Sequence, residues 1–375
     1  MSRASISVFV YLILIGFVFF YACRQGFLEG LFKPKSQRES YTRLLHKESK
    51  ALAEAWDSLG QVAIKNPLVI GDVYSEKARF REAEAVAYSI SLPPGRMLDI
   101  RIVNNGSRPL YADLLRVDSG GGRWIFNADT SRLHFETETV HGDTWILRIQ
   151  PQTDYRGDYS LEVNNTPLLG WPIPEGIKSH IGSHWGVARD GGARSHEGID
   201  IFAARGSPVL AMADGFISRV GENNLGGKVV FQQHRKLPFT LYYAHLDSQI
   251  AVAGSSVRKG DTIGLVGNTG NARTTPPHLH LGIYTRDGAI NPWSFIQPKT
   301  AAIAPEDALP AARRAVLKAN THGWILPDEK SQRVRFARND TLTVNALTSS
   351  FFRVENQASL KGFVNKKAIE SVLQP

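Results

Sequence analysis

Residues 276–282 read Pro-Pro-His-Leu-His-Leu-Gly, and histidine and leucine alternate strictly from 278 to 281. Residues i and i+2 of a β-strand point to the same face, so His278 and His280 approach one site while Leu279 and Leu281 face a core. The alternation therefore predicts a strand with one polar and one apolar face. By itself it does not distinguish a metal site from a pair of buried structural histidines.

A second patterned histidine begins the run His196-Glu-Gly-Ile-Asp200, which starts like the HExxH helix of many zinc peptidases. Asp200, however, stands where the second histidine of that helix would be. Gly198, followed by Ile-Asp-Ile-Phe, favours an extended strand over a helix. We therefore predict no zinc helix here and assign no role to Glu197.

A third histidine, His245, lies in the strand-like run Tyr-Tyr-Ala-His-Leu of residues 242–246. Alone it is more often a structural residue. In order, however, an HxxxD, a central YxHL and a later HxH within residues 196–280 resemble the lysostaphin/LytM-type zinc metalloendopeptidases, a family of peptidoglycan hydrolases. The resemblance covers about residues 172–296 and extends to the short segments 198–201, 206–209, 213–216, 257–264, 266–270 and 291–292.

The resemblance implies a role for each of these residues. It implies that one Zn²⁺ per chain is bound by His196, Asp200 and His280. It also implies that His278 and His245 do not bind the metal but flank the zinc-bound water. The fold it implies is antiparallel β, with the site in a groove across the sheet.

The chemistry of these side chains fits the implied roles. Two neutral imidazoles, a carboxylate and a water make a tetrahedral zinc site with one open position, which is typical of catalytic rather than structural zinc. Imidazoles suit proton transfer because their unperturbed pKa is about 6.5. We assign His278 and His245 jointly to proton transfer and oxyanion stabilisation; the sequence leaves open which of them is the base.

One segment departs from the family pattern. The family usually shows Ser-x-Phe-Gly-x-Arg near the start of the domain, and here residues 179–184 read Ser-His-Ile-Gly-Ser-His. His184 therefore replaces a permanent cation. His180 and His184 are either additional groove residues or solvated loop histidines.

The N-terminal residues from Ala4 to Cys23 carry no charge and are rich in Ile, Val, Leu and Phe. About 20 such residues cross a bilayer as a helix, so we expect a transmembrane anchor over 4–23. A lipoprotein signal ending at Cys23 and a cleaved signal peptide are the alternatives. Basic residues after the span favour a cytoplasmic C-terminus, but long domains translocate despite flanking charge. We expect a single-pass protein of the bacterial inner membrane whose catalytic domain faces the periplasm or cell wall.

The rest of the chain predicts a mainly β, multidomain protein. Residues 24–84 are expected as a helical stalk, with a capping box at Ser36 and Glu39 and a helix over 36–65. Period-two alternation predicts a β-sandwich-like domain over 85–170. The zinc peptidase domain follows at 171–297, then a linker at 298–319. Residues 320–375 predict a small barrel-like module, similar to bacterial Src-homology-type wall-binding modules, or else a structural appendage.

Composition and charge exclude several classes of protein and of binding partner. With 42% hydrophobic and 21% charged residues, the chain is neither globally disordered nor polytopic. Its single cysteine excludes an intrachain disulfide. The net charge of +9 is spread along the chain, which suits an anionic cell wall better than a nucleic-acid groove. We therefore expect no nucleic-acid partner.

The function we expect is zinc-dependent hydrolysis of peptide bonds in peptidoglycan stems or cross-bridges during cell-wall remodelling. The expected partners are peptidoglycan and, through the N-terminal helix, the membrane; the sequence names no protein partner. Two alternatives stay open. One is a non-catalytic wall-binding scaffold or activator of another wall hydrolase, and the other is a zinc peptidase that acts on a glycine-rich protein.

Overall fold

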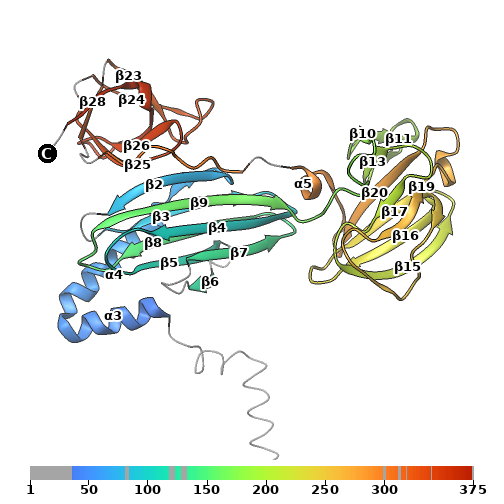
Figure 1. The fold of residues 1–375 in the computed structure, drawn as a ribbon, viewed down its shortest axis with the longest axis horizontal. Coiled ribbons are helices and arrows are strands. Elements are labelled where there is room, and N and C mark those ends of the chain that lie inside the picture. The colour runs from blue at the N-terminus through green and yellow to red at the C-terminus, as the bar shows by residue number, and fades with distance from the viewer. Residues whose placement is uncertain are drawn as a thin grey trace, which may run out of the picture.

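The computed structural model describes residues 36–80, 84–117, 123–127, 133–298, 301–310, 314–317, 319–338 and 340–373. Figure 1 shows two helices against a layered β unit, a small curled β unit beside it, and a separate β unit at the opposite end. The predicted mainly β fold is confirmed, because the large sheets are built mostly from antiparallel pairs. The predicted span 4–23 lies outside the described residues, and no helix within them has the length and apolar character needed to cross a bilayer.

Residues 36–65, expected as one helix, form two helices, α3 (Gln37–Glu48) and α4 (Lys50–Lys65). The capping box of Ser36 and Glu39 is present at the start of α3. Ser49 interrupts the helix because its backbone is extended, with φ −158° and ψ 120°, and its side chain caps α4. A serine can accept the orphan N–H bonds of a new first turn, which compensates for the break.

The two helices, expected as a stalk or a packing helix, pack on the β-sandwich. Trp56 of α4 is buried, and its Nε1 donates to the Pro151 carbonyl over 2.8 Å. Tyr41 of α3 lies edge-on to Trp56, with ring centroids 5.2 Å apart. Tyr111 of the sandwich completes this aromatic cluster. Burial of aromatic surface therefore holds the helices against the sheet.

The β-sandwich joins two sheets over one shared apolar core. A five-stranded sheet has the order β1-β3-β8-β5-β6, and the strands β2-β9-β4-β7 of a larger sheet lie across from it. The strands are β1 (Leu68–Ile70), β2 (Tyr74–Phe80), β3 (Val86–Leu92), β4 (Arg96–Asn104), β5 (Leu110–Val117), β6 (Arg123–Asn127), β7 (His134–Thr139), β8 (Asp143–Pro151) and β9 (Gly157–Pro167). Strands β1 and β2 fall within the range expected as stalk, because the alternation of Tyr74, Ala78 and Phe80 into the core continues the sandwich pattern.

The C-terminal unit is joined to the sandwich by backbone hydrogen bonds. Its strands are β22 (Arg314–Leu317), β23 (Thr321–Trp324), β24 (Arg333–Phe336), β25 (Leu342–Leu347), β26 (Phe351–Glu355), β27 (Lys361–Asn365) and β28 (Ile369–Leu373). Strand β25 pairs with β2, where Lys77 faces Leu347 and Ala78 faces Ala346, so one 11-stranded sheet runs through both units. The unit also has its own apolar core. Strand β22 lies in the range expected as linker and pairs with β25 and β28.

The third unit carries a ten-stranded antiparallel sheet of order β10-β13-β20-β17-β16-β15-β18, with β14, β19 and β21 attached. Its strands are β10 (His180–Ser183), β11 (Ala188–Arg189), β12 (Arg194–Ser195), β13 (Ile199–Phe202), β14 (Pro208–Leu210), β15 (Gly215–Asn223), β16 (Gly227–His234), β17 (Thr240–Gln249), β18 (Ser256–Val257), β19 (Thr262–Val266), β20 (His278–Thr285) and β21 (Gly288–Ile290). The short helix α5 (Trp293–Ile296) follows. One core cluster fills this unit.

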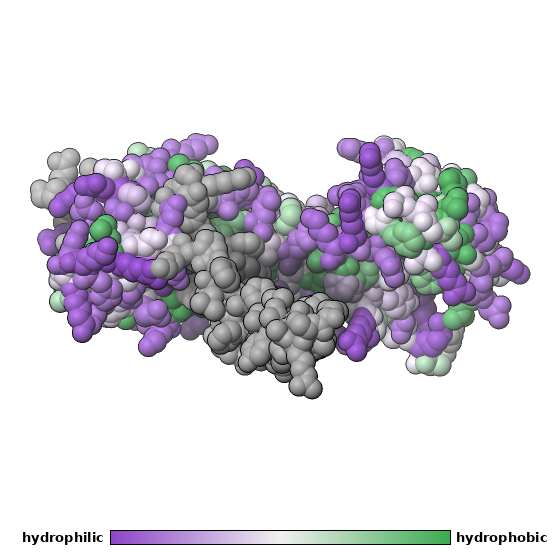
Figure 2. Space-filling model, turned by 90° about the horizontal axis from the view of Figure 1, so that it is seen from below, coloured by the Kyte–Doolittle hydropathy of each residue, from purple (hydrophilic) through white to green (hydrophobic). Residues whose placement is uncertain are grey.

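Close packing joins this unit to the sandwich. Gly95 has a φ of +73°, and a Cβ there would lie 2.3 Å from the Phe295 ring of α5, so only glycine allows this approach. Arg96 is almost fully buried and donates to the Gln297 carbonyl over 2.7 Å. Figure 2 shows one face of the resulting two-lobed molecule, which is mainly hydrophilic with separate small hydrophobic patches on both lobes.

Candidate metal centre

Strand register brings the patterned residues of β13 and β20 together. Asp200 of β13 lies directly opposite His280 of β20, while Ile201 opposes Leu279 on the other face. Directly opposed side chains of an antiparallel pair have Cβ atoms about 4.5–5.5 Å apart. The polar pair therefore shares one face of the sheet, and the apolar pair lies in the core. The strand predicted at residues 278–281 and the extended state predicted after Gly198 are both confirmed.

His196 reaches the same place from the end of a two-stranded ribbon, β11 with β12. Gly198 lets the chain pass close to β20: a Cβ there would lie 2.5 Å from the Leu281 carbonyl oxygen and 2.6 Å from the His280 ring. A larger residue at 198 would push His196 away from His280. His196 and Asp200 are thus brought together by a close approach between strands and not by a turn of helix.

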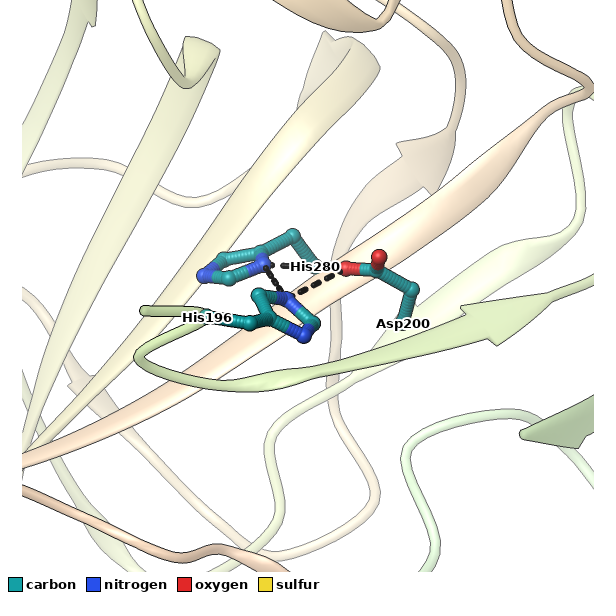
Figure 3. Close-up of side chains that lie close together, drawn as sticks. All are labelled: His196, Asp200 and His280. Carbon is teal, nitrogen blue, oxygen red and sulfur yellow. Dashed lines mark hydrogen bonds and ion pairs between the residues drawn. The ribbon is translucent and has the colours of Figure 1, made fainter. Parts of the chain in front are cut away.

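The nearest side-chain atoms of these three residues form a close triangle (Figure 3). His196 Nε2 lies 3.0 Å from His280 Nδ1 and 3.1 Å from Asp200 Oδ1, and His280 Nδ1 lies 3.0 Å from the same oxygen. His196 and Asp200 are buried, and His280 is half-buried. Ligand atoms about 2.0–2.1 Å from a tetrahedral zinc ion are separated by little more than this.

The hydrogen bonds around these three atoms are consistent with a cation between them. The other nitrogen of His196, Nδ1, lies 2.8 Å from the His184 carbonyl oxygen, so Nδ1 carries the proton and Nε2 presents a lone pair. Asp200 Oδ1 also presents lone pairs only. One proton on His280 Nδ1 satisfies one of its two contacts but not both. A metal ion satisfies all three atoms, so the residues fit a zinc ion, which prefers two imidazoles and a carboxylate.

The second carboxylate oxygen of Asp200 faces a different partner. Arg189 Nη2 donates to Asp200 Oδ2 over 2.6 Å. Burial works to raise the pKa of the Asp200 carboxyl, but the adjacent imidazoles of His196 and His280 outweigh burial and hold that pKa well below its usual range. Asp200 is therefore a carboxylate whose two oxygens have different neighbours.

His278 and His245 lie next to the triangle. The His245 ring centroid is 5.0 Å from that of His278 and 5.8 Å from that of His280. The Nδ1 atoms of His245 and His278 lie 2.9 Å from the carbonyl oxygens of Thr269 and Pro276. Each Nδ1 therefore donates to the backbone, and each Nε2 is left as an acceptor on the site.

An unusual backbone places His245. Ala244 opposes His280 on the site face, so strict alternation would direct His245 into the core beside Tyr243. Instead His245 has a φ of +62°, a left-handed conformation, within a register shift between β16 and β17. This conformation turns the imidazole back toward the site. Strained residues of this kind cluster at functional sites.

The environment lowers the pKa of two of the imidazoles, those of His245 and His280. Burial first, and then the charges that His280 and His278 would carry, lower the pKa of His245 to about 4. Burial also lowers the pKa of His280, although Asp200 opposes this. Neutral imidazoles can bind a metal ion or accept a proton near neutral pH.

The structure adds Arg189 and Ser183 to the site and places His180 and His184, the two histidines that the sequence left open. Arg189 and Ser183 contact the outer atoms of Asp200 and His196. His184 contributes its backbone carbonyl to His196, while its ring lies against Trp293. His180 is exposed and stacks on Phe202. The only sequence signal for Arg189 is its place in an Arg-Asp-Gly-Gly turn shortly before His196.

Among the described residues, a second group with metal-ligating side chains lies on the sandwich, made of Asp99, His134 and Glu136. There His134 Nε2 lies 2.9 Å from Asp99 Oδ1, which an N–H donor satisfies without a metal. Arg101 also donates to both oxygens of Asp99. The contacts of Asp99 in this surface group are therefore met by N–H donors of the chain.

The sequence model of peptidase family M23 matches residues 194–292, which contain all five histidine and aspartate residues of the site. These residues form an M23 peptidase domain. The resemblance to the lysostaphin/LytM-type enzymes is thereby confirmed for this part of the chain.

Named relatives match the M23 domain and its surroundings. An L-Ala–D-Glu endopeptidase of Bacillus subtilis is 37% identical over 133 residues, which are 33% of this chain and 40% of the relative. The DD-carboxypeptidase/endopeptidase Mpg of Neisseria meningitidis is 40% identical over 121 residues, 32% of this chain and 27% of the relative. An uncharacterized metalloprotease of Haemophilus influenzae is 36% identical over 113 residues, which are 30% of this chain and 23% of the relative. The chain thus spans less than half the length of these curated relatives.

Among solved structures, the catalytic domain of lysostaphin from Staphylococcus simulans is 30% identical to this chain. The match covers 32% of this chain and 91% of that domain, with a TM-score of 0.29.

Proposed function

We propose that this protein is a zinc-dependent endopeptidase that hydrolyses peptide bonds in peptidoglycan stems or cross-bridges during cell-wall remodelling. The observation that carries the proposal is the triangle of His196, Asp200 and His280, whose facing atoms lie 3.0–3.1 Å apart and lack enough protons to satisfy one another. The names of the relatives from Bacillus subtilis and Neisseria meningitidis, both endopeptidases, support the substrate class.

In this proposal His196 Nε2, His280 Nδ1 and Asp200 Oδ1 hold one zinc ion per chain. Three protein ligands leave a fourth position open, as catalytic zinc sites do. When bound, zinc supplies Lewis-acid polarisation of the scissile carbonyl and lowers the pKa of a water ligand toward about 7. The chain's contribution is to fix the three ligand atoms on one face of the sheet before substrate arrives.

His245 and His278 handle the protons in this proposal. Each donates Nδ1–H to a backbone carbonyl, which fixes the ring and directs the acceptor Nε2 toward the site. One imidazole would take the proton of the attacking water at Nε2 and return it to the leaving amine, and while that proton is held the positive charge on the pair of rings would stabilise the oxyanion. Positioned general acids and bases contribute about 10²–10⁴-fold to rate.

We also propose that residues 4–23 anchor the chain in the bacterial inner membrane, with the M23 domain facing the periplasm or cell wall. The uncharged, apolar character of this segment supports the anchor. The net charge of +9 supports contact with an anionic envelope. Peptidoglycan and the membrane are then the partners.

The test is a digest of purified sacculi with the full chain in detergent, with zinc or with a chelator, analysed by mass spectrometry. We expect new amine termini that identify the cleaved bond and disappear with chelator. The His280→Ala variant serves as the matched inactive control. A parallel panel of glycine-rich peptides tests the protein-substrate alternative, since cleavage of those peptides but not of sacculi would replace the proposed substrate. A folded protein with one bound zinc and no hydrolysis would favour a wall-binding scaffold.

A further inference from the structure

Arg189 lies in a ribbon that also delivers His196 to the site. Strands β11 and β12 pair Ala188 with Ser195 and Arg189 with Arg194. The turn between them, Asp-Gly-Gly at 190–192, has glycines with φ of +70° and +102°, which glycine adopts without strain. The ribbon therefore fixes Arg189 relative to the chain that enters His196.

The guanidinium of Arg189 contacts groups around two of the three proposed ligands. Its Nη2 donates to Asp200 Oδ2 over 2.6 Å and to Ser183 Oγ over 2.8 Å. Ser183 Oγ in turn lies 3.3 Å from His196 Nδ1. The hydroxyl thus shares the N–H that His196 directs mainly to the His184 carbonyl.

We propose that Arg189 is a positioning residue that keeps Asp200 a one-oxygen ligand of the metal, an inference that rests on the proposed zinc site. The two carboxylate oxygens have separate partners: Oδ1 faces His196 and His280, and Oδ2 is taken by Arg189. A carboxylate whose second oxygen is held in this way cannot turn to give both oxygens to one ion. The fourth coordination position therefore stays free for water and substrate.

Two effects of the guanidinium on the metal oppose each other. Its positive charge repels a cation, but its side chain is 35% exposed, so water screens that repulsion. Its hydrogen bond to the 8% exposed Asp200 is charge-assisted and local. Orientation therefore outweighs repulsion, and losing an outer partner of a metal ligand typically lowers metal affinity by about 10–100-fold. The family pattern carries arginine at the place of His184, and in this chain Arg189 is the cation that reaches Asp200.

The test compares Arg189→Met, Arg189→Lys and Arg194→Met in the full chain. Arg194 is the cross-strand partner of Arg189, so its substitution removes the same charge from the same ribbon. The readouts are zinc affinity by chelator competition and the visible spectrum of the cobalt-substituted protein. Four-coordinate cobalt absorbs several times more strongly than five- or six-coordinate cobalt.

We expect Arg189→Met to lower zinc affinity by about 10–100-fold and to weaken the cobalt bands several-fold. Arg189→Lys, which keeps one donor, falls in between, and Arg194→Met matches the wild type. Wild-type spectrum and affinity in both folded Arg189 variants, or tighter zinc binding in Arg189→Met, would overturn the inference. A wild-type chain that binds no zinc would instead overturn the proposed function.

Discussion

Two buried groups of charged side chains lie in different units of this chain, and they differ in whether their hydrogen bonds are complete. Between the sandwich and the C-terminal unit, Glu76 is fully buried and its two oxygens accept from the hydroxyls of Tyr74 and Tyr88. Arg353 also donates to both oxygens, over 3.0 and 3.1 Å. In the M23 domain, by contrast, lone pairs of His196 and Asp200 face each other with too few protons between them.

The difference separates a structural polar cluster from a binding site. Buried polar groups in folded proteins are as a rule satisfied. The Glu76 group meets this rule with the chain's own donors, so it needs nothing further and serves to join two units. In the proposed function, the His196 group meets it with a bound cation. Burial and charge are common to both groups, and the count of donors against acceptors distinguishes them.

The largest expected effect is loss of the metal from the incomplete group. His280→Ala removes one of three ligands, so we expect no stoichiometric zinc and a fall in activity beyond the roughly 10–100-fold typical of losing an outer partner. Elemental analysis of zinc per chain after gel filtration measures this. His134→Ala, in the surface group on the sandwich, is the control and should keep one zinc. One retained zinc in His280→Ala would remove His280 from the ligand set.

The next effect separates metal binding from proton transfer. His245→Ala and His245→Asn should retain zinc while kcat falls by about 10²–10⁴-fold, because a general acid or base is lost. Asparagine is chosen because it tolerates the left-handed backbone at this position. His322→Asn, at an exposed position of the C-terminal unit, should leave turnover unchanged. Near-normal kcat in both His245 variants would exclude His245 from the mechanism.

Breaking the group around Glu76 should change the stability of the fold and leave zinc binding unchanged. Arg353→Met leaves Glu76 buried without its cation, so we expect the free energy of unfolding to fall by about 3–5 kcal/mol. Adding Glu76→Gln removes the unpaired charge and should recover part of the loss. Urea denaturation measures both, and zinc affinity should not change. Arg101→Met, which breaks an exposed pair with Asp99, should cost no more than about 1 kcal/mol.

Chelating the metal should lower the free energy of unfolding by less than breaking the pair of Arg353 and Glu76 does. At a free zinc concentration of 100 times Kd, binding stabilises the folded M23 domain by about 2.7 kcal/mol, and a chelator removes this contribution. Thermal unfolding should therefore show a chelator-sensitive transition for the M23 domain alone. The His280→Ala variant supplies the check, since a chelator that shifts its transition as well would point to an effect unrelated to the site.

Local pattern predicted much of the fold. Alternation at 278–281 and the residues after Gly198 predicted strands that the structure contains, and Ser36 with Glu39 predicted a helix start. The break at Ser49 was not predicted, because a serine inside a helical pattern is compatible with both a continuous helix and a new cap. The pairing of β2 with β25 was not predictable either, since it joins residues far apart in the sequence.

The sequence by itself singled out the candidate site residues. The period of a strand paired His278 with His280, and the resemblance to the lysostaphin/LytM-type enzymes added His196, Asp200 and His245. Only the tertiary structure decided their geometry: the register that sets Asp200 against His280, the left-handed turn at His245 and the ribbon that directs Arg189 to Asp200. These depend on pairing between distant segments, whose free energy comes from packing and hydrogen bonds that no short window of sequence contains.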